Sequence, residues 1–247
     1  MKLKTAKNKK IKEYYPLNQK SFVVKTGNFV YYKYKDFKAD KGMNKFKEFG
    51  LTIYCGMQGD GKTVSMTEKL EQIRHQYPKV KIATNFGYVH QDFALTDWLQ
   101  ILEERNGEDG IVFAIDEIQN EFNVYDTRNF SENLLRTVTQ QRKQAIKIYA
   151  TSQHFNRVAK PLREQTFEVV DCFTFAGRWT FQKCFSADEY NVVIDNPERK
   201  QKLHRKWRKN FVQNDYIRTL NNSYEVIQSM VKLEKEERKK EKVVGIR

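Results

Sequence analysis

Residues 51–66 read LTIYCGMQGDGKTVSM, and this stretch decides the fold. Gly56, four further residues and the tripeptide GKT at 61–63 match the pattern G-x-x-x-x-G-K-[ST] of a phosphate-binding loop. The apolar run 51–55 predicts a buried strand before the loop, and residues 62–77 have the spacing of a helix after it. A strand, a glycine-rich loop and a helix in this order predict a nucleotide site.

The residue types of this loop suit the binding of a triphosphate. Glycines let the backbone turn tightly and point several N–H groups at phosphate oxygens, and the start of the following helix adds the positive end of its dipole. In this pattern the lysine, here Lys62, bridges the β- and γ-phosphates, and the hydroxyl of Thr63 ligates Mg²⁺. ATP and Mg²⁺ are therefore the expected cofactors. The residues expected to bind ATP are Gly56, Met57, Gln58, Gly59, Asp60, Gly61, Lys62, Thr63 and Val64.

A second candidate motif is IVFAIDE at 111–117, where Asp116 lies 53 residues after Thr63. A continuous apolar run predicts a strand that is covered on both faces, and an acid at its end can hold the Mg²⁺ shell beside a phosphate loop. We assign that role to Asp116, and we assign to Glu117 the role of general base for the attacking water. The alternative is that both acids simply begin a surface loop after a core strand.

Residues 146–151 (IKIYAT) predict another strand, which ends in the polar sequence Thr151-Ser152-Gln153-His154. A polar residue at this strand end can contact the γ-phosphate or the attacking water, which is the task of a sensor residue. Gln153 is the first candidate for this role and Ser152 is the second. The alternative is that these polar side chains belong to an ordinary loop, and His154 receives no role.

The candidates for an arginine finger lie between the second motif and the end of the core: Arg136, Arg142, Arg157 and Arg163. An arginine finger supplied by a neighbouring subunit can accelerate hydrolysis by about 10³–10⁵. Arg142 lies at the end of an expected helix, just before the candidate sensor strand, and is the first candidate for this finger; Arg163 is the second. The alternative for each of them is an ordinary surface arginine or a phosphate contact.

The remaining patterns complete an α/β fold. Further expected elements are a hairpin at 20–37, strands at 80–84, 167–175 and 178–185, helices at 96–105 and 131–144, and a solvated helix at 223–242. Strands that alternate with helices predict a mostly parallel α/β sheet flanked by helices. Together with the phosphate-binding loop, this pattern resembles a P-loop NTPase of the RecA/ASCE-like type. One strand and one helix between the two motifs suit the additional-strand, catalytic-glutamate ATPases. The expected domains are a basic N-terminal arm with a β-hairpin-like segment (1–49), the ATPase core (50–197) and a basic, helical C-terminal extension (198–247).

Positive charge gathers at both ends of the chain, whose formal net charge is +14. Residues 1–49 carry +10, residues 50–197 carry −4 and residues 198–247 carry +8. One interpretation is solvated tails; the other is contact with phosphate backbones, which follows from counterion release. The block RKQKLHRKWRKN at 199–210 places Trp207 among seven basic residues, so stacking and charge can act together. The candidate DNA contacts are Arg199, Lys200, Arg205, Lys206, Trp207, Arg208 and Lys209.

The composition excludes several classes of protein. Hydrophobic residues make up 39% of the chain and aromatic residues 13%, which is enough to bury a core and argues against wholesale disorder. The longest apolar stretch is far shorter than the ~20 residues of a spanning helix, and the basic N-terminus lacks the apolar segment of a signal peptide. Three cysteines without metal-like spacing indicate a reducing environment. We therefore expect a cytoplasmic protein with no transmembrane segment of its own.

Three stretches together resemble one branch of the P-loop ATPases: GMQGDGKT at 56–63, VFAIDEIQNEF at 112–122 and LLRTVTQQRKQAIKIYATSQHFNRVAKPLREQT at 134–166. This is the HerA/FtsK branch, and within it the chain resembles phage genome-packaging ATPases and the zonula-occludens-toxin-like assembly ATPases of filamentous phages. The resemblance implies a homo-oligomeric ring, a pentamer or hexamer, that moves DNA by ATP hydrolysis, commonly at a capsid portal. It also implies that Arg142 is the trans-acting finger.

The expected function is therefore the ATP-driven movement of double-stranded DNA into a capsid, in the host cytoplasm and docked on a procapsid. Two alternatives stay open. One is an assembly ATPase that moves single-stranded DNA and coat protein at a membrane, although such toxin-like relatives usually carry a transmembrane helix that this sequence does not show. The other is a nucleotide-gated DNA-binding switch with slow hydrolysis. A small-molecule kinase is disfavoured because acceptor-site and lid signatures are missing.

Overall fold

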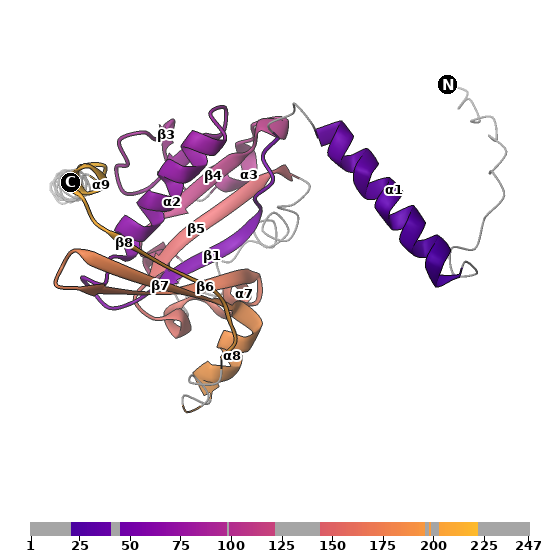
Figure 1. Cartoon of the computed structure of the whole chain (residues 1–247). Helices are drawn as coiled ribbons and strands as arrows, with labels where there is room; N and C mark the ends of the chain where they lie inside the picture. Colours follow the sequence, from indigo (N-terminus) through magenta and orange to yellow (C-terminus); the bar gives the residue numbers. More distant parts are fainter. Residues whose placement is uncertain are drawn as a thin grey trace, which may run out of the picture. The chain divides into compact units, whose positions relative to one another are not determined.

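The computed structural model describes residues 21–40, 45–97, 99–121, 144–195, 198 and 203–221. The chain divides into two compact units, Met1–Asn44 and Lys45–Arg247. The described part of the first unit is helix α1 (Phe22–Asp40) (Figure 1). The second unit contains one sheet and the helices that cover it. Among the described residues, no helix is both long enough and apolar enough to cross a membrane.

The expectation of a hairpin at 20–37 is wrong, because helix α1 occupies this segment. The Val, Phe and Tyr residues of this segment favour strands, but propensity is a weak guide, and a hairpin of two strands alone is barely stable in water. In a helix each backbone N–H instead bonds within the segment itself. The hydroxyl of Thr26 adds a bond to the carbonyl of Phe22 at 3.0 Å. The aromatic side chains of the helix, including Phe29 and Tyr34, are exposed.

The second unit is built on an eight-stranded sheet with the strand order β3-β2-β4-β5-β1-β6-β7-β8. Its strands are β1 (Gly50–Cys55), β2 (Lys81–Thr84), β3 (Phe93–Ala94), β4 (Ile111–Ile115), β5 (Ile146–Ser152), β6 (Thr166–Phe175), β7 (Trp179–Ser186) and β8 (Arg205–Val212). All neighbours from β3 to β6 pair in parallel, whereas β6, β7 and β8 pair antiparallel. The mostly parallel α/β sheet of a P-loop NTPase is confirmed.

The strand order brings the two sequence motifs to one edge of the sheet. Strand β5 lies between β1, which leads into the phosphate loop, and β4, which ends beside Asp116. An additional strand does separate the two motifs, but it is β5, which follows both motifs in the chain. Strand β2, at the position expected for the inserted strand, instead pairs with the far side of β4. Because these strands are parallel, their carboxyl ends meet at the same edge.

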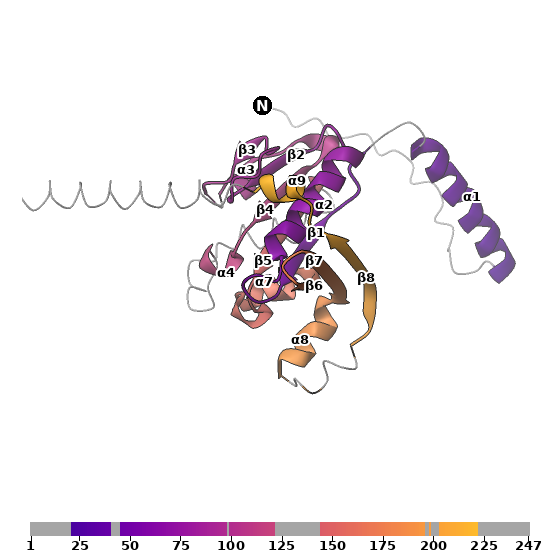
Figure 2. The ribbon, with the colours of Figure 1, turned by 60° about the vertical axis from the view of Figure 1, so that its left-hand side comes forward.

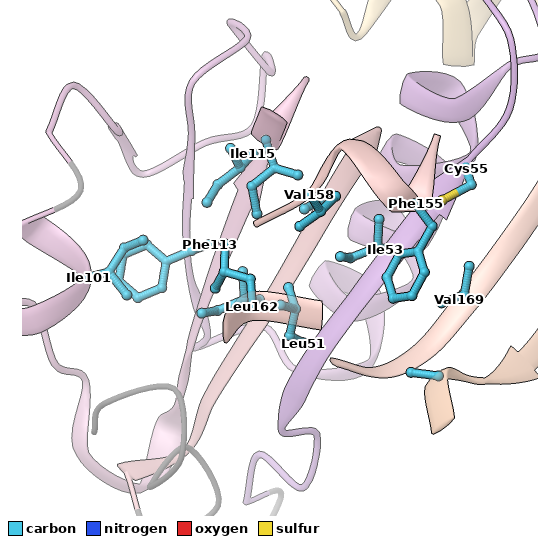
Figure 3. Packing of buried hydrophobic residues seen from close by; sticks show 14 of the residues in the cluster. Leu51, Ile53, Cys55, Ile101, Phe113, Ile115, Phe155, Val158, Leu162 and Val169 are labelled. Carbon is cyan, nitrogen blue, oxygen red and sulfur yellow. The ribbon is translucent and has the colours of Figure 1, made fainter. Parts of the chain in front are cut away.

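Helices cover both faces of the sheet. Helix α2 (Lys62–Gln76) lies along one face, where Met66, Leu70 and Ile73 join a buried cluster with side chains of the sheet (Figure 1). On the other face, α7 (Lys160–Glu164) and α8 (Ala187–Asp195) pack over a second buried cluster. Figure 3 shows this cluster, in which Ile53 and Cys55 of β1 lie near Phe155, and Leu51 of β1 lies near Leu162.

Two further expectations need correction. The helix expected at 96–105 is only the short α3 (Gln100–Glu103), because the backbone N–H groups of Thr96 and Asp97 donate to the side chain of Gln100 instead of entering a helical turn. The C-terminal extension was expected to be helical, but its residues 205–212 form β8, which pairs with β7.

Strand β8 and helix α9 (Asp215–Thr219) belong to the same compact unit as the core (Figure 2). The remaining described elements are α4 (Ile118–Glu121) and the 3-10 helices η2 (Gly107–Asp109) and η4 (Phe155–Arg157). The helices expected at 131–144 and 223–242 fall outside the described residues, apart from Gln144.

Candidate nucleotide site

The loop between β1 and α2 has its side chains folded back onto its own backbone. Met57 donates its N–H to Asp60 Oδ2 at 2.6 Å, and Asp60 donates its N–H to the carbonyl of Met57 at 3.1 Å. The ammonium of Lys62 donates to the same carbonyl at 3.0 Å, although the Lys62 side chain is only 7% exposed. A lysine held at this position has its charge directly beside the N–H groups of the loop, which is the arrangement that binds polyphosphate.

Two glycines of the loop are required by their surroundings. A Cβ at Gly61, whose φ is +77°, would lie 2.5 Å from Thr174 Oγ1, and a Cβ at Gly56 would lie 2.8 Å from the carbonyl oxygen of Cys172. Both neighbours lie on β6, which extends past the end of β1 and flanks the loop. The glycines of the motif therefore serve close packing against β6 as well as the turn itself.

Asp116 and Thr63, the two expected magnesium ligands, lie in direct contact. The Thr63 hydroxyl donates to Asp116 Oδ1 at 3.0 Å, and the Thr151 hydroxyl donates to the same oxygen at 2.5 Å. Burial raises the pKa of the Asp116 carboxyl, and the hydrogen bonds from Thr151 and Thr63 act in the opposite direction. These bonds hold the Asp116 carboxylate beside the phosphate loop, next to the hydroxyl of Thr63 in the first turn of α2.

The backbone beside Asp116 is held from both neighbouring strands. Asn85, which follows β2, accepts the N–H of Asp116 on its side-chain oxygen at 2.7 Å and donates its amide to the Asp116 carbonyl at 3.2 Å. On the other side, Thr151 of β5 accepts the N–H of Glu117 at 2.8 Å. Glu117 has a φ of +52°, which is uncommon for a residue other than glycine and is found where surrounding contacts fix the backbone.

The Glu117 carboxylate is bracketed by two side-chain amides. Asn120 donates to Oε2 at 3.0 Å, and Gln153 donates to Oε1 at 3.5 Å. Arg157 in turn donates to the side-chain oxygen of Gln153 at 3.0 Å. A chain of contacts therefore runs from Arg157 through Gln153 to Glu117, and the sensor candidate lies next to the candidate base. Ser152 points elsewhere, since it is buried and its hydroxyl donates to the carbonyl of His154.

The donor set at this site fits Mg²⁺. A carboxylate oxygen and a threonine hydroxyl are hard oxygen ligands, and Mg²⁺ usually takes only one or two protein ligands together with waters and substrate phosphates. Thr63 and Asp116 supply those two oxygens at hydrogen-bonding distance from each other. The described residues contain no group of three or more His, Cys, Asp or Glu side chains that could hold a metal ion. The oxygens of Thr63 and Asp116 suit a Mg²⁺ ion whose other ligands are waters and phosphate oxygens.

The expected arginines divide into two groups. Arg136 and Arg142 lie outside the described residues, so the preferred finger stays a prediction. Arg163 lies on α7, and its buried Nε has no hydrogen-bond partner within the described part of the chain. Arg157 was not preferred on sequence grounds, yet among the candidates that the structure describes it is the one that contacts Gln153, which in turn donates to Glu117.

Three contributors to the site were missed by sequence reasoning: Asn85, Asn120 and Thr151. Asn85 and Thr151 come from strands on either side of β4, so their contacts depend on the order of strands in the sheet. The signal that could have found them is their place at strand ends, because the carboxyl ends of parallel strands share one edge. Asn120 could have been found as the residue one turn after Glu117.

The candidate DNA contacts lie away from the loop motifs. Arg199 and Lys200 are outside the described residues, and the other five lie on β8. Trp207 is partly buried against the cluster beneath α2, and the ammonium of Lys209 lies 5.2 Å from its ring centre. Lys206 pairs with Glu168 at 3.0 Å. Arg205 and Arg208 are exposed on this strand.

A cavity of 690 Å³ adjoins the phosphate loop on the face opposite α2. It is lined by the loop residues Met57 and Asp60, by Gln153 and by aromatic side chains of β6 and β7, Phe173 and Phe181. Asp171, which also lines it, accepts a hydrogen bond from the hydroxyl of Tyr190 at 2.7 Å.

No protein-family model matches this sequence, and no curated protein matches it significantly. Solved structures are similar in fold. The N-terminal domain of zonular occludens toxin from Neisseria meningitidis shares 15% identity over 70% of this chain and 99% of its own, with a TM-score of 0.51. The DNA-packaging ATPase of Sulfolobus turreted icosahedral virus shares 12% identity over 69% of this chain and 94% of its own, with a TM-score of 0.45. The chain therefore has the P-loop NTPase fold of the zonular occludens toxin domain.

Proposed function

We propose that this protein is an ATPase that couples hydrolysis to the movement of DNA in phage genome packaging or assembly. The observation that carries the proposal is the convergence of Thr63, Asp116, Thr151 and Glu117 at the carboxyl edge of a parallel sheet, beside a phosphate-binding loop. These residues come from three separate places in the sequence. Only the folded sheet assembles them, and together they match the needs of triphosphate hydrolysis.

In this mechanism the loop N–H groups and the Lys62 ammonium bind the β- and γ-phosphates. Glu117 accepts the proton of the attacking water, and its position is fixed by Asn120 and by the backbone bond to Thr151. Gln153, within 3.5 Å of that carboxylate, orients the water or senses the γ-phosphate. Thr63 and Asp116 would hold Mg²⁺, which when bound neutralises charge that develops on the phosphates.

The test of this mechanism is Glu117→Gln, which keeps the shape of the side chain and removes the base. We expect hydrolysis to fall by about 10²–10⁴-fold while the affinity for ATP stays near that of the wild type. Glu108→Gln is the matched control, because Glu108 is an exposed glutamate that pairs with Lys45 away from the loop. Single-turnover hydrolysis and binding of a fluorescent ATP analogue give the two readouts. Full activity in Glu117→Gln would remove the general base from the proposal.

The oligomeric ring and the trans arginine are parts of the proposal that rest on the resemblance in sequence. If Arg142 acts across a subunit interface, a small fraction of Arg142→Ala protein mixed into wild type should reduce the rate more than in proportion to its share. The DNA-stimulated ATPase rate should also rise more steeply than linearly with protein concentration. A strictly proportional loss of activity would argue for sites that act independently.

The membrane-associated assembly ATPase is the second candidate, and the fold likeness to the zonular occludens toxin domain favours it. The two candidates differ in their substrates. A packaging motor should be stimulated by duplex DNA, whereas an assembly ATPase should sediment with membranes and prefer single-stranded DNA. The ATPase rate with equal lengths of duplex and single-stranded DNA, together with co-sedimentation with vesicles, separates them. A slow rate that DNA does not change would favour a nucleotide-gated switch instead.

A further inference from the structure

The antiparallel part of the sheet presents three rows of side chains on the face opposite α2. Paired residues of antiparallel strands point to the same face, and residues alternate between faces along each strand. The pairing gives the rows Asp171–Lys183–Arg208, Phe173–Phe181–Asn210 and Phe175–Trp179–Val212. Aromatic residues therefore gather over β6 and β7 at the end of the sheet that lies beside the phosphate loop.

These aromatic rings are accessible. Phe173 is 56% exposed, Phe175 is 60% exposed and Trp179 is 45% exposed, while Phe181 is partly buried. The Trp179 and Phe181 rings lie 5.0 Å apart at 34°, and the Trp179 ring is further held by its N–H, which donates to Asn210 Oδ1 at 3.0 Å. We call Phe173, Phe175, Trp179 and Phe181 the aromatic platform.

On the same face of the sheet, helix α8 covers the other end of β6 and β7. Val169 and Phe185 are buried there beneath α8, whose Tyr190 ring meets Phe155 edge to face and lies at a tilt to Phe185. Figure 2 shows α8 at one end of β6 and β7. Helix α8 thus covers one part of this face of the sheet. The aromatic platform lies on the part that α8 does not cover. Large exposed apolar groups that gather in one place usually mark a binding surface.

Basic side chains border the platform on β7 and β8. Lys183 and Arg208 lie side by side in the adjacent row, and both are exposed. The same two rows supply Phe173, Phe181 and Lys183 to the 690 Å³ cavity beside the loop. Flat rings on an open sheet face with cations at their edge are the surface on which single-stranded nucleic acids stack their bases. Paired bases of a duplex offer no such free faces.

We propose that the aromatic platform binds single-stranded nucleic acid, with bases stacked on Trp179 and Phe173 and phosphates near Lys183 and Arg208. This assignment replaces Trp207, which lies on the opposite face, as the stacking residue. It goes beyond the proposed ATPase function, because it names a strand type and a surface that need no nucleotide in the loop. Direct binding measurements without ATP therefore test it even where hydrolysis fails.

The experiment measures binding of a fluorescent 30-nucleotide oligothymidylate and of a 30-base-pair duplex by anisotropy, at one fixed salt concentration and with the full chain. Wild type should bind the single strand more tightly. Trp179→Leu and Phe173→Leu keep apolar bulk but remove the flat ring, and each should weaken single-strand binding at least about fivefold. Tyr216→Leu, an exposed aromatic residue on α9, is the matched control and should leave it unchanged.

A second readout leaves the platform intact. In protein with Trp98→Phe and Trp207→Phe, the fluorescence of Trp179 should be quenched by oligothymidylate. Unchanged affinity in the folded leucine variants, or no quenching of Trp179, would overturn the proposal. If the leucine variants lose self-association in sedimentation while single-strand affinity is kept, the platform is an interface between copies of this chain and the proposal is likewise overturned.

Discussion

Thr151 is the residue that ties the two acids of the candidate site together. Its hydroxyl donates to Asp116 Oδ1 and accepts the N–H of Glu117, so one side chain sets the position of both. Replacing it with valine keeps the volume and removes both bonds. We expect Thr151→Val to reduce hydrolysis strongly and to lower the free energy of unfolding by about 1–3 kcal/mol, because the half-buried Asp116 carboxylate loses a donor and the Glu117 N–H loses its acceptor.

The control for that change is Thr166→Val. Thr166 is also buried, and its hydroxyl donates to the carbonyl of Leu162 at 2.8 Å, far from the loop in the sheet. It should destabilise by a similar amount without reducing hydrolysis per folded molecule. Denaturant unfolding and the ATPase rate, measured on both variants, separate the structural effect from the effect on the site. Equal rates in the two variants would show that Thr151 does not position the acids.

Lys147 predicts a dependence of stability on pH. This lysine of β5 is 6% exposed, donates to Thr52 Oγ1 at 2.8 Å, and burial lowers its pKa to about 8. The unfolded chain keeps a proton that the folded chain releases between pH 8 and the ordinary lysine pKa of about 10.4. The unfolded state then binds more protons, so the contribution of Lys147 to stability must rise with pH across that window.

We expect the stability of wild type relative to Lys147→Met to increase from pH 8 to pH 10, and to be flat below pH 7. Urea unfolding at one-unit steps measures it. Lys81→Met is the control for the loss of a lysine side chain, because Lys81 is exposed on β2. A difference that falls as pH rises would mean that the folded protein holds the Lys147 proton more tightly than the unfolded chain does.

At the scale of elements, the conformation of the phosphate loop depends on strand β6, which packs against it. Gly61→Ala would bring a methyl group to 2.5 Å from Thr174 on β6 and would place alanine at a φ of +77°. Gly107→Ala shares the backbone penalty, at φ +58°, but meets nothing within 4 Å. We expect Gly107→Ala to cost about 1 kcal/mol of stability and to leave ATP affinity unchanged.

The Gly61→Ala substitution should lower the free energy of unfolding more than Gly107→Ala does. It should also weaken ATP binding strongly, because the phosphate loop must shift to avoid the clash with β6. Thermal unfolding and titration with a fluorescent ATP analogue check both expectations. If the two alanines behave alike in ATP binding, then β6 does not constrain the loop, and the clash is relieved by rotation of the Thr174 side chain.

The sequence predicts best the elements that carry a clear pattern, such as an apolar run that ends in a motif. Strand β4 is a continuous apolar run and β1 is largely apolar, and the positions of Lys62, Thr63, Asp116 and Glu117 follow from the motifs at the ends of these two strands. Helix α1 and strand β8 were misjudged because their side chains are mostly exposed, so no buried face imposes a period of 3.6 or 2 on the pattern. The strand-end positions of Asn85 and Thr151 place both residues at the edge of the site, but their contacts with Asp116 and Glu117 depend on which strands become neighbours, which the sequence pattern does not give.

At the scale of the whole molecule, the two compact units differ in character. The first unit has a large excess of positive charge, and the second contains the buried hydrophobic clusters. Every residue of both buried clusters lies in the unit Lys45–Arg247, whereas residues 1–44 carry a formal charge of +9. We therefore expect a protein that begins at Lys45 to unfold cooperatively within a few degrees of the full chain. Its binding of duplex DNA should weaken, because phosphate contacts by the basic arm release counterions.

The salt dependence of that binding decides whether the arm contacts DNA at all. Each phosphate contact that is lost should make the slope of log K against log salt shallower by about 0.9. Anisotropy titrations of the full and shortened chains at several salt concentrations measure this slope, and circular dichroism checks the fold of the shortened chain. Removing only residues 1–20 separates the basic segment from α1. If the slope stays the same while the shortened chain is folded, the N-terminal charge is a solvated tail, and the contacts with DNA must lie on the unit that contains the sheet.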